Sequence, residues 1–140
     1  MAKTAVVYWS GTGNTEAMAQ AVAEGAKGKG AEVDVLTPDA FGPDAMDAYD
    51  AVAFGCPAMG AEELEDSEFL PMFESIRSKL SGKKVALFGS YGWGDGEWMR
   101  TWEEQTAGDG AVLACESLIV NEMPDDDGLA KCRAFGEALA

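Results

Sequence analysis

Five short apolar runs alternate with helix-patterned stretches along the whole chain, and this alternation restricts the fold more than any other feature. The runs are "TAVVYW" (4–9), "EVDVL" (32–36), "AVAFG" (51–55), "KVALFG" (84–89) and "AVLACESLIV" (111–120). Nearly continuous hydrophobicity is typical of strands that are buried on both faces, as in a parallel sheet. The sequence therefore predicts an α/β protein, a doubly wound three-layer sandwich with a five-stranded parallel sheet.

The stretches between the runs repeat apolar residues with the period of an α-helix. The apolar stripes are Met18, Ala21, Val22 and Ala26; Phe69, Phe73, Ile76 and Leu80; Trp98 and Trp102; and Leu129, Cys132, Gly136 and Leu139. No internal repeat or linker divides the chain, so we expect residues 1–140 to form a single domain. The connection 37–50 follows the second predicted strand and has no cluster of glycines or aromatic residues. It is expected only to turn the chain.

Composition excludes several function classes. The net charge of −15 would repel nucleic acid and attract a basic protein. Without His, no metal site is expected. No apolar run is long enough to span a bilayer, and no signal-peptide pattern opens the chain, so we expect no membrane association. Cys56, Cys115 and Cys132 form no CxxC pair and are expected to be reduced thiols of a cytoplasmic protein; the alternative is redox or metal chemistry.

Loops rich in glycine or polar residues follow four of the predicted strands. In a doubly wound sheet, ligands bind beyond the carboxyl ends of the strands, so these loops are expected to meet at one rim. They read "SGTGNT" after the first strand, "CPAMGAEE" after the third, "SYGWGDGEW" after the fourth and "NEMPDDD" after the fifth.

The first of these loops has the features of an anion site without a positive charge. It consists of Ser10, Gly11, Thr12, Gly13, Asn14 and Thr15. Its hydroxyls, its amide and the free N–H groups of the helix that follows are suitable donors for one phosphate. The nucleotide motif GxxxxGK[ST] lacks its Lys here, and Glu16 stands where GxGxxG needs a third glycine. The alternative is a polar turn in which Asn14 caps the helix.

Met59 and Trp93 are candidates for the two sides of a flat ligand. Trp93 lies between two glycines, which give it no bulky neighbours in sequence, and Met59 lies in the glycine-containing loop after the third strand. A soft thioether and an aromatic ring both pack well on a heterocycle. The alternative for each is a core residue. Together with the first loop, they indicate a ligand that combines a phosphate with a flat heterocycle.

The chain resembles the short-chain flavodoxins over nearly its full length. The resemblance rests on "VVYWSGTGNTEAMA", "GCPAMGAEELEDSEF", "GKKVALFGSYGWGDGEWM" and "IVNEMPD". It implies the sheet order 2-1-3-4-5 and a monomeric, low-potential, one-electron carrier. The implied carrier holds FMN non-covalently and shuttles it between semiquinone and hydroquinone.

The resemblance also implies which residues hold FMN. Ser10 to Thr15 match the phosphate loop, and Trp9 would border the ribityl chain. Pro57 stands where some relatives have a Ser that adds a phosphate donor. The two flavin loops would be Ala58, Met59, Gly60, Ala61 and Glu62, and then Ser90, Tyr91, Gly92, Trp93, Gly94, Asp95 and Gly96.

Within these loops the resemblance implies particular roles. Met59 and Trp93 would cover the inner and outer faces of the ring, and the carboxylate of Glu62 would accept the flavin N(3) proton. Ala61 replaces an acidic or hydroxyl residue that is common in relatives. A carbonyl in the turn around Gly60 could accept a hydrogen bond from protonated N(5), because glycine tolerates the positive φ of a flipped peptide.

Acidic residues crowd the predicted rim. They are Glu62, Glu63, Glu65, Asp66, Glu68, Asp95, Glu97 and Asp125 to Asp127. We expect them to lower the potential of the second reduction step and to attract redox partners with basic docking surfaces. The alternative is an ordinary solvated face.

We expect an electron carrier that is not a catalyst acting on a substrate of its own. The sequence leaves two other functions open. One is an FMN-dependent NAD(P)H or quinone reductase, and the other is a binding module for a phosphorylated small molecule.

Overall fold

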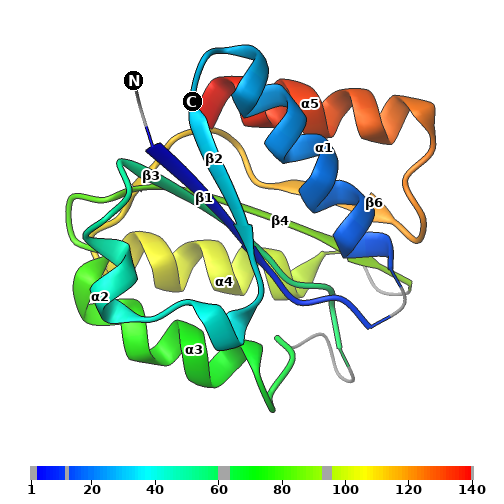
Figure 1. Cartoon of the computed structure of the whole chain (residues 1–140). Coiled ribbons are helices and arrows are strands. Elements are labelled where there is room, and N and C mark those ends of the chain that lie inside the picture. Colours follow the sequence, from blue (N-terminus) through cyan, green and yellow to red (C-terminus); the bar gives the residue numbers. More distant parts are fainter. Residues whose placement is uncertain (1–2, 12, 60–63, 93–95, 140) are drawn as a thin grey trace.

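Strands and helical segments alternate along most of the chain (Figure 1). The computed structural model describes residues 3–11, 13–59, 64–92 and 96–139. The strands are β1 (Lys3–Tyr8), β2 (Glu32–Leu36), β3 (Ala51–Gly55), β4 (Lys84–Tyr91), β5 (Val112–Leu113) and β6 (Leu118–Asn121). The α-helices are α1 (Asn14–Gly28), α2 (Pro43–Met46), α3 (Phe69–Ile76), α4 (Glu97–Gly108) and α5 (Asp126–Leu139). Two 3-10 helices, η1 (Pro38–Ala40) and η2 (Arg77–Lys79), complete the order.

The sheet is parallel throughout its described ladders and has the predicted order β2-β1-β3-β4-β5. Val6 of β1 stands beside Ala53 of β3, and Ala53 stands beside Ala86 of β4. Because side chains alternate between faces along a strand, this row points to one face and the next row, Val7, Phe54 and Leu87, points to the other.

The fifth strand differs from the continuous run 111–120 expected from the sequence. β5 pairs with the start of β4 at Lys84 and Val85, and β6 pairs with its end from Phe88 onward. The four residues 114–117 therefore stand opposite only two residues of β4, so the chain must bulge between the two short strands. The hydroxyl of Ser117 donates to the Glu103 carboxylate, which holds this bulge against α4.

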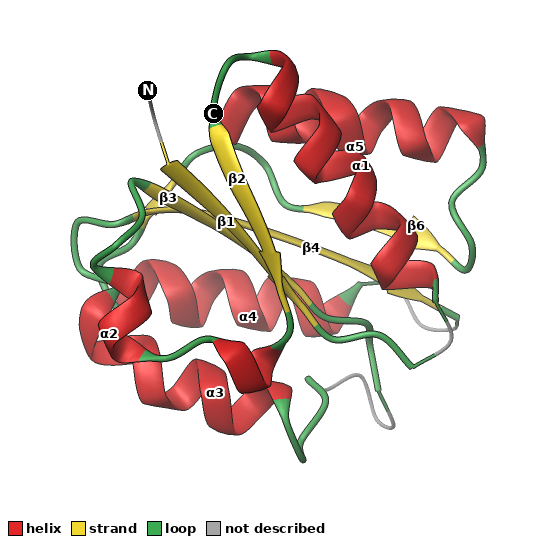
Figure 2. Cartoon of the chain, in the orientation of Figure 1, coloured by secondary structure: helices red, strands yellow, loops and turns green. Residues whose placement is uncertain are grey.

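Helices cover both faces of the sheet (Figure 2). α1 and α5 lie on the face of Val6, where the predicted stripe of Met18, Ala21, Val22 and Ala26 is buried. α2, α3 and α4 lie on the face of Val7, where the stripes from Phe69 and Trp98 are buried. The helical stripes predicted from the sequence are thus confirmed, with Leu129 only partly buried.

The connection after β2 does more than turn the chain, so that prediction was wrong. Phe41, Met46 and Tyr49 are buried against β3 and α3, and the Tyr49 hydroxyl donates to Asp34 at 2.7 Å. The ring of Phe41 packs edge-on against that of Phe54, with centroids 6.0 Å apart. The apolar residues of this segment are spaced too irregularly to show a helical period.

Candidate functional site

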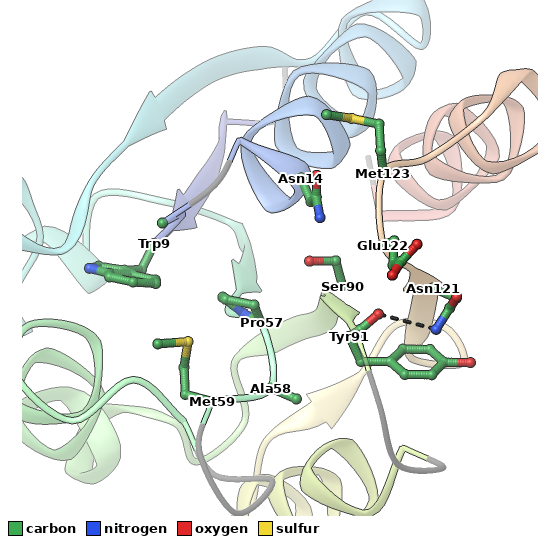
Figure 3. A pocket seen from close by; sticks show the side chains of 12 residues that line it. Trp9, Asn14, Pro57, Ala58, Met59, Ser90, Tyr91, Asn121, Glu122 and Met123 are labelled. Carbon is green, nitrogen blue, oxygen red and sulfur yellow. Dashed lines mark hydrogen bonds between the residues drawn. The ribbon is translucent and has the colours of Figure 1, made fainter.

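A cavity of about 640 Å³ opens beyond the carboxyl ends of the strands (Figure 3). It brings together the segments that follow β1, β3, β4 and β6. Its lining residues are Trp9, Gly11, Asn14, Pro57, Ala58, Met59, Ser90, Tyr91, Gly92, Asn121, Glu122 and Met123. All four of the loops singled out in the sequence therefore contribute residues to this cavity.

The start of α1 leaves several backbone donors free beside this cavity. Gly13 is the N-cap, with φ at 97°, and its carbonyl accepts the N–H of Ala17 at 3.0 Å. The N–H groups of Asn14, Thr15 and Glu16 precede that first helical bond and have no acceptor within the helix. Asn14 is therefore the first residue of α1, and its predicted alternative role as the cap is wrong.

The hydroxyls of the first loop have different surroundings. Ser10 Oγ accepts the N–H of Gly13 at 3.0 Å and so fixes the turn that leads into α1. Thr15 is buried, and its hydroxyl lies 3.1 Å from that of Ser90. This contact ties the start of α1 to the end of β4. Thr12 lies outside the described residues.

A second hollow of about 550 Å³ adjoins the first, and Trp9 and Gly11 line both. Its other lining residues are Tyr8, Ser10, Gly13, Glu16, Thr37, Pro38, Asp39 and Glu68. The indole N–H of Trp9 donates to Glu68 Oε2 at 2.6 Å. Thr37, Pro38 and Asp39 were missed in the sequence, because nothing in the connection 37–50 signalled a ligand.

The segment Cys56–Ala58 is held against the end of β4. The N–H of Cys56 donates to Phe88 O at 3.1 Å, and that of Ala58 donates to Ser90 O at 3.0 Å. From α4, the indole N–H of Trp98 donates to Cys56 O at 3.2 Å. A Cβ on Gly89 would lie 2.2 Å from the same carbonyl, so this approach requires glycine. Burial raises the pKa of the Cys56 thiol to about 12, which keeps it protonated and unreactive.

Met59 follows this anchored segment and is 38% exposed, so its alternative role as a core residue is wrong. In Figure 3 its side chain lies near Trp9, on the side of the cavity opposite Tyr91. Seven residues expected in the two flavin loops or near them lie outside the described residues. They are Gly60, Ala61, Glu62, Glu63, Trp93, Gly94 and Asp95. Gly96, the last residue expected in the second flavin loop, is the N-cap of α4.

From the sequence, Asn121, Glu122 and Met123 were expected on the rim but were not predicted to bind the ligand. The Tyr91 carbonyl accepts the Asn121 side-chain amide at 3.3 Å (Figure 3). It also accepts the N–H of Glu122 at 2.7 Å. Glu122 adopts a left-handed conformation with φ at 57°, which is uncommon for a residue other than glycine. Their position at the end of the last strand and directly after it was the available signal.

Glu65 was expected among the exposed rim carboxylates, and the structure corrects this. It is only 6% exposed, and its carboxylate accepts the N–H groups of Ser67, Glu68 and Phe69. Burial alone would raise the pKa of Glu65, but these hydrogen bonds and that of the Ser67 hydroxyl outweigh it and hold the pKa below its usual value. Nothing in "EELEDSE" distinguishes the one acid that folds inward.

The remaining described rim acids are exposed. They are Asp66, Glu68, Glu97 and Asp125 to Asp127. No Lys or Arg is among the described residues that line either hollow. Within the same part of the chain, no group of three or more acidic or Cys side chains is arranged to hold a metal ion. No helix among these residues is long and apolar enough to cross a membrane.

Comparison with known proteins gives consistent matches. A family profile described as Flavodoxin matches residues 6–136. The chain is 50% identical over 135 residues to the flavodoxin of Megasphaera elsdenii, covering 96% of each chain, and 49% identical to that of Clostridium beijerinckii, covering 96% and 97%. The solution structure of two-electron reduced Megasphaera elsdenii flavodoxin has a TM-score of 0.90 at 48% identity and 97% coverage of both chains.

Proposed function

The chain belongs to the flavodoxin family, and from this premise we propose how its own residues hold FMN and deliver electrons. As a flavodoxin, it is a low-potential electron carrier with non-covalently bound FMN. Bound FMN supplies the chemistry, because it accepts and releases electrons one at a time. The protein supplies binding, orientation and electrostatics.

The main support for FMN binding is the arrangement of donors and cavity at one edge of the sheet. Uncharged donors and a broad, partly apolar cavity lie side by side at the carboxyl edge of the sheet. This donor set fits a phosphate, and the walls formed by Pro57, Ala58, Met59 and Tyr91 fit a flat ring. The residues present therefore fit FMN.

The phosphate end is formed by the start of α1. The N–H groups of Asn14, Thr15 and Glu16 point out of the helix, where the macrodipole also favours an anion. The Asn14 amide and the hydroxyl of Ser10 add donors from side chains. Because no described cation lines the hollows, the phosphate charge is held without neutralisation, which disfavours further negative charge on the ring nearby.

The ring end is formed by the segments after β3 and β4. Met59 would cover one face of the ring, and Ala58 and Tyr91 would line the slot. The roles expected for residues outside the described ranges stay predictions. These are stacking by Trp93, a hydrogen bond from flavin N(3)–H to the Glu62 carboxylate and a hydrogen bond from N(5)–H to the Gly60 carbonyl. Ala61, Gly94 and Asp95 would form the rest of the loops.

Spectroscopy of the purified protein tests this function. We expect FMN absorption bands, two separate one-electron steps in a reductive titration, and much tighter binding of FMN than of riboflavin, which lacks the phosphate. Rapid reduction by NAD(P)H alone would favour a reductase, which is the alternative to our proposal that the protein is not a catalyst. A colourless protein that takes up no FMN would favour the binding module.

The exposed acids support the proposal that redox partners with basic docking surfaces approach this rim. We expect the bimolecular rate of electron transfer to a basic partner to fall as ionic strength rises, and a rate independent of salt would contradict this docking mode. We also propose a monomer, to be checked by light scattering. The three unpaired cysteines are consistent with the proposed cytoplasmic location, a reducing compartment.

A further inference from the structure

The turn before α3 is organised around the buried carboxylate of Glu65. Oε1 accepts the N–H groups of Glu68 at 2.7 Å and Phe69 at 2.8 Å, and Oε2 accepts the N–H and the hydroxyl of Ser67. The Glu65 carbonyl also accepts the N–H of Leu70 at 2.9 Å. Both oxygens of the carboxylate are therefore used to fix residues 65–70 in one conformation.

The same end of the turn is held to the sheet. The N–H of Glu65 lies 3.4 Å from Cys56 Sγ, and Cys56 is fixed by β4 and by Trp98. The turn thus has a defined position relative to the carboxyl edge. A carboxylate that only added charge to the surface would be expected to stay in solvent, so the burial of Glu65 indicates a structural role.

From this turn, the side chain of Glu68 reaches Trp9 at the end of β1. The distance from Trp9 Nε1 to Glu68 Oε2 is 2.6 Å, typical of a hydrogen bond to a charged acceptor. On its other side the Trp9 ring meets Gly11, where a Cβ would lie 3.0 Å from ring atom Cη2. The ring is therefore fixed between Glu68 and the phosphate loop, where it divides the two hollows.

We propose that Glu65 is a positioning residue for the cofactor site: its buried carboxylate sets the turn that lets Glu68 hold the Trp9 indole as the wall beside the bound cofactor. Neither Glu65 nor Glu68 reacts. Glu65 acts through Glu68, and Glu68 acts through the orientation of Trp9. The proposal rests on the proposed FMN function only in its last step, from Trp9 to cofactor affinity.

The first test uses the full-length protein free of FMN. In a ¹H–¹⁵N spectrum, the Trp9 indole N–H, assigned with Trp9→Phe, should resonate downfield and exchange slowly with solvent. Glu68→Leu should move this signal upfield and speed its exchange, while Glu68→Gln, which keeps an acceptor oxygen, should retain most of the shift. Glu65→Gln should act like Glu68→Leu, although it leaves the acceptor itself in place.

Two further variants keep this test decisive. Asp66→Asn removes one charge from the same turn at an exposed position and should leave the Trp9 signal unchanged. If Glu65→Gln does not fold, Ser67→Ala removes a single donor to the Glu65 carboxylate and should give a smaller shift in the same direction. A Trp9 signal that is unaffected by Glu65→Gln, or by Ser67→Ala in its place, would overturn the positioning role.

The second test measures FMN affinity of the same proteins by fluorescence titration. Loss of a hydrogen bond to a charged group corresponds to a factor of about ten or more. We expect Glu65→Gln and Glu68→Leu to raise the FMN dissociation constant about tenfold, and Glu68→Gln and Asp66→Asn to change it by less than about threefold. Unchanged affinity in Glu68→Leu would overturn the last step alone, whereas a wild type that binds no FMN would overturn the proposed function and leave the Trp9 result standing.

Discussion

The two faces of the sheet are packed in different ways. On the α1 and α5 face the strands and helices present mainly small residues, among them Ala19, Ala23, Ala53 and Ala86. On the α3 and α4 face the core is filled by large rings, and Phe73 touches three of them: Phe54, Phe69 and Trp102. One face is therefore held by close approach of backbones and the other by interlocking side chains.

The close approach of α1 and α5 depends on two glycines. A Cβ on Gly25 would lie 1.9 Å from Arg133 O, and one on Gly136 would lie 2.0 Å from Val22 O. With the backbones in contact, α1 has little freedom to shift along α5. The proposed phosphate donors are backbone groups at the start of α1, so this packing would fix their position.

The rings of the other face support a different part of the site. Trp98 anchors the segment before Met59 through Cys56 O, and its ring lies 5.7 Å from that of Tyr91. Besides the backbone hydrogen bonds of Cys56 and Ala58 to β4, side chains therefore help to position the segments at the proposed ring end, and side chains adjust more readily than a backbone contact. The proposed phosphate end of the site is therefore supported by backbone contact between two helices, whereas the proposed ring end depends in part on more adaptable side-chain contacts.

The largest expected effect tests the aromatic face. Phe73→Ala should lower the free energy of unfolding by about 3–5 kcal/mol, because a fully buried ring is removed from a cluster of rings. Phe135→Ala on the α5 face should cost less, since Phe135 is slightly exposed and meets one described ring, Phe88. Urea unfolding of both variants measures the difference, and equal losses of stability would show that the aromatic cluster contributes no more than the α5 face.

The next effect tests the close helix contact. Gly136→Ala should lower the free energy of unfolding by about 3 kcal/mol, the upper end for an overpacked site, because the added methyl group meets the Val22 carbonyl. Gly28→Ala is the matched control in α1, where nothing lies within 4 Å of the added carbon. Its stability should change by less than about 1 kcal/mol. If both variants were equally stable in urea, the two helices would not be held by backbone contact.

The next effect is the pH dependence of the stability that the buried carboxylate of Glu65 contributes at the edge of the aromatic face. Because the pKa of Glu65 is lowered in the folded protein, its stabilisation is present above the usual carboxyl value of 4.5 and is lost as the pH falls through the lower folded pKa. Glu65→Gln should cost about 2 kcal/mol at neutral pH, and its deficit should shrink on acidification below pH 4.5.

Thermal unfolding of the wild type and Glu65→Gln from neutral pH downward gives this difference directly. Asp109, whose pKa Arg77 also lowers, contributes to acid unfolding in both proteins and cancels in the comparison. A deficit that stays constant with pH would show that the Glu65 charge is not what stabilises the turn.

The smallest effect concerns the rim between the two faces. Glu122→Gly should raise the free energy of unfolding by up to about 1 kcal/mol, because glycine adopts the left-handed conformation without strain. Glu122→Ala removes the same carboxylate but keeps a Cβ, so the difference between the two variants in urea isolates the backbone contribution. No difference would mean that the turn after β6 is unstrained.

Much of this architecture follows from sequence alone, for a physical reason. Burial of a strand on both faces requires a continuous apolar run, and burial of one helix face requires a 3.6-residue period, so both leave a local pattern. The four strand regions up to residue 91, the stripes of α1, α3 and α4, and the loops that meet at the carboxyl edge could all be predicted in this way. The specific motifs of those loops also indicated the family and FMN.

Tertiary structure decided the features whose cause lies far away in the chain. The break between β5 and β6 depends on pairing with β4, and the inward turn of Glu65 depends on donors that only the folded turn presents. The identity of Gly25 is explained only by the carbonyl of Arg133 on another helix. An acidic residue and a glycine look the same in sequence whether they face solvent or a neighbouring backbone, because only the packed chain determines which groups lie beside them.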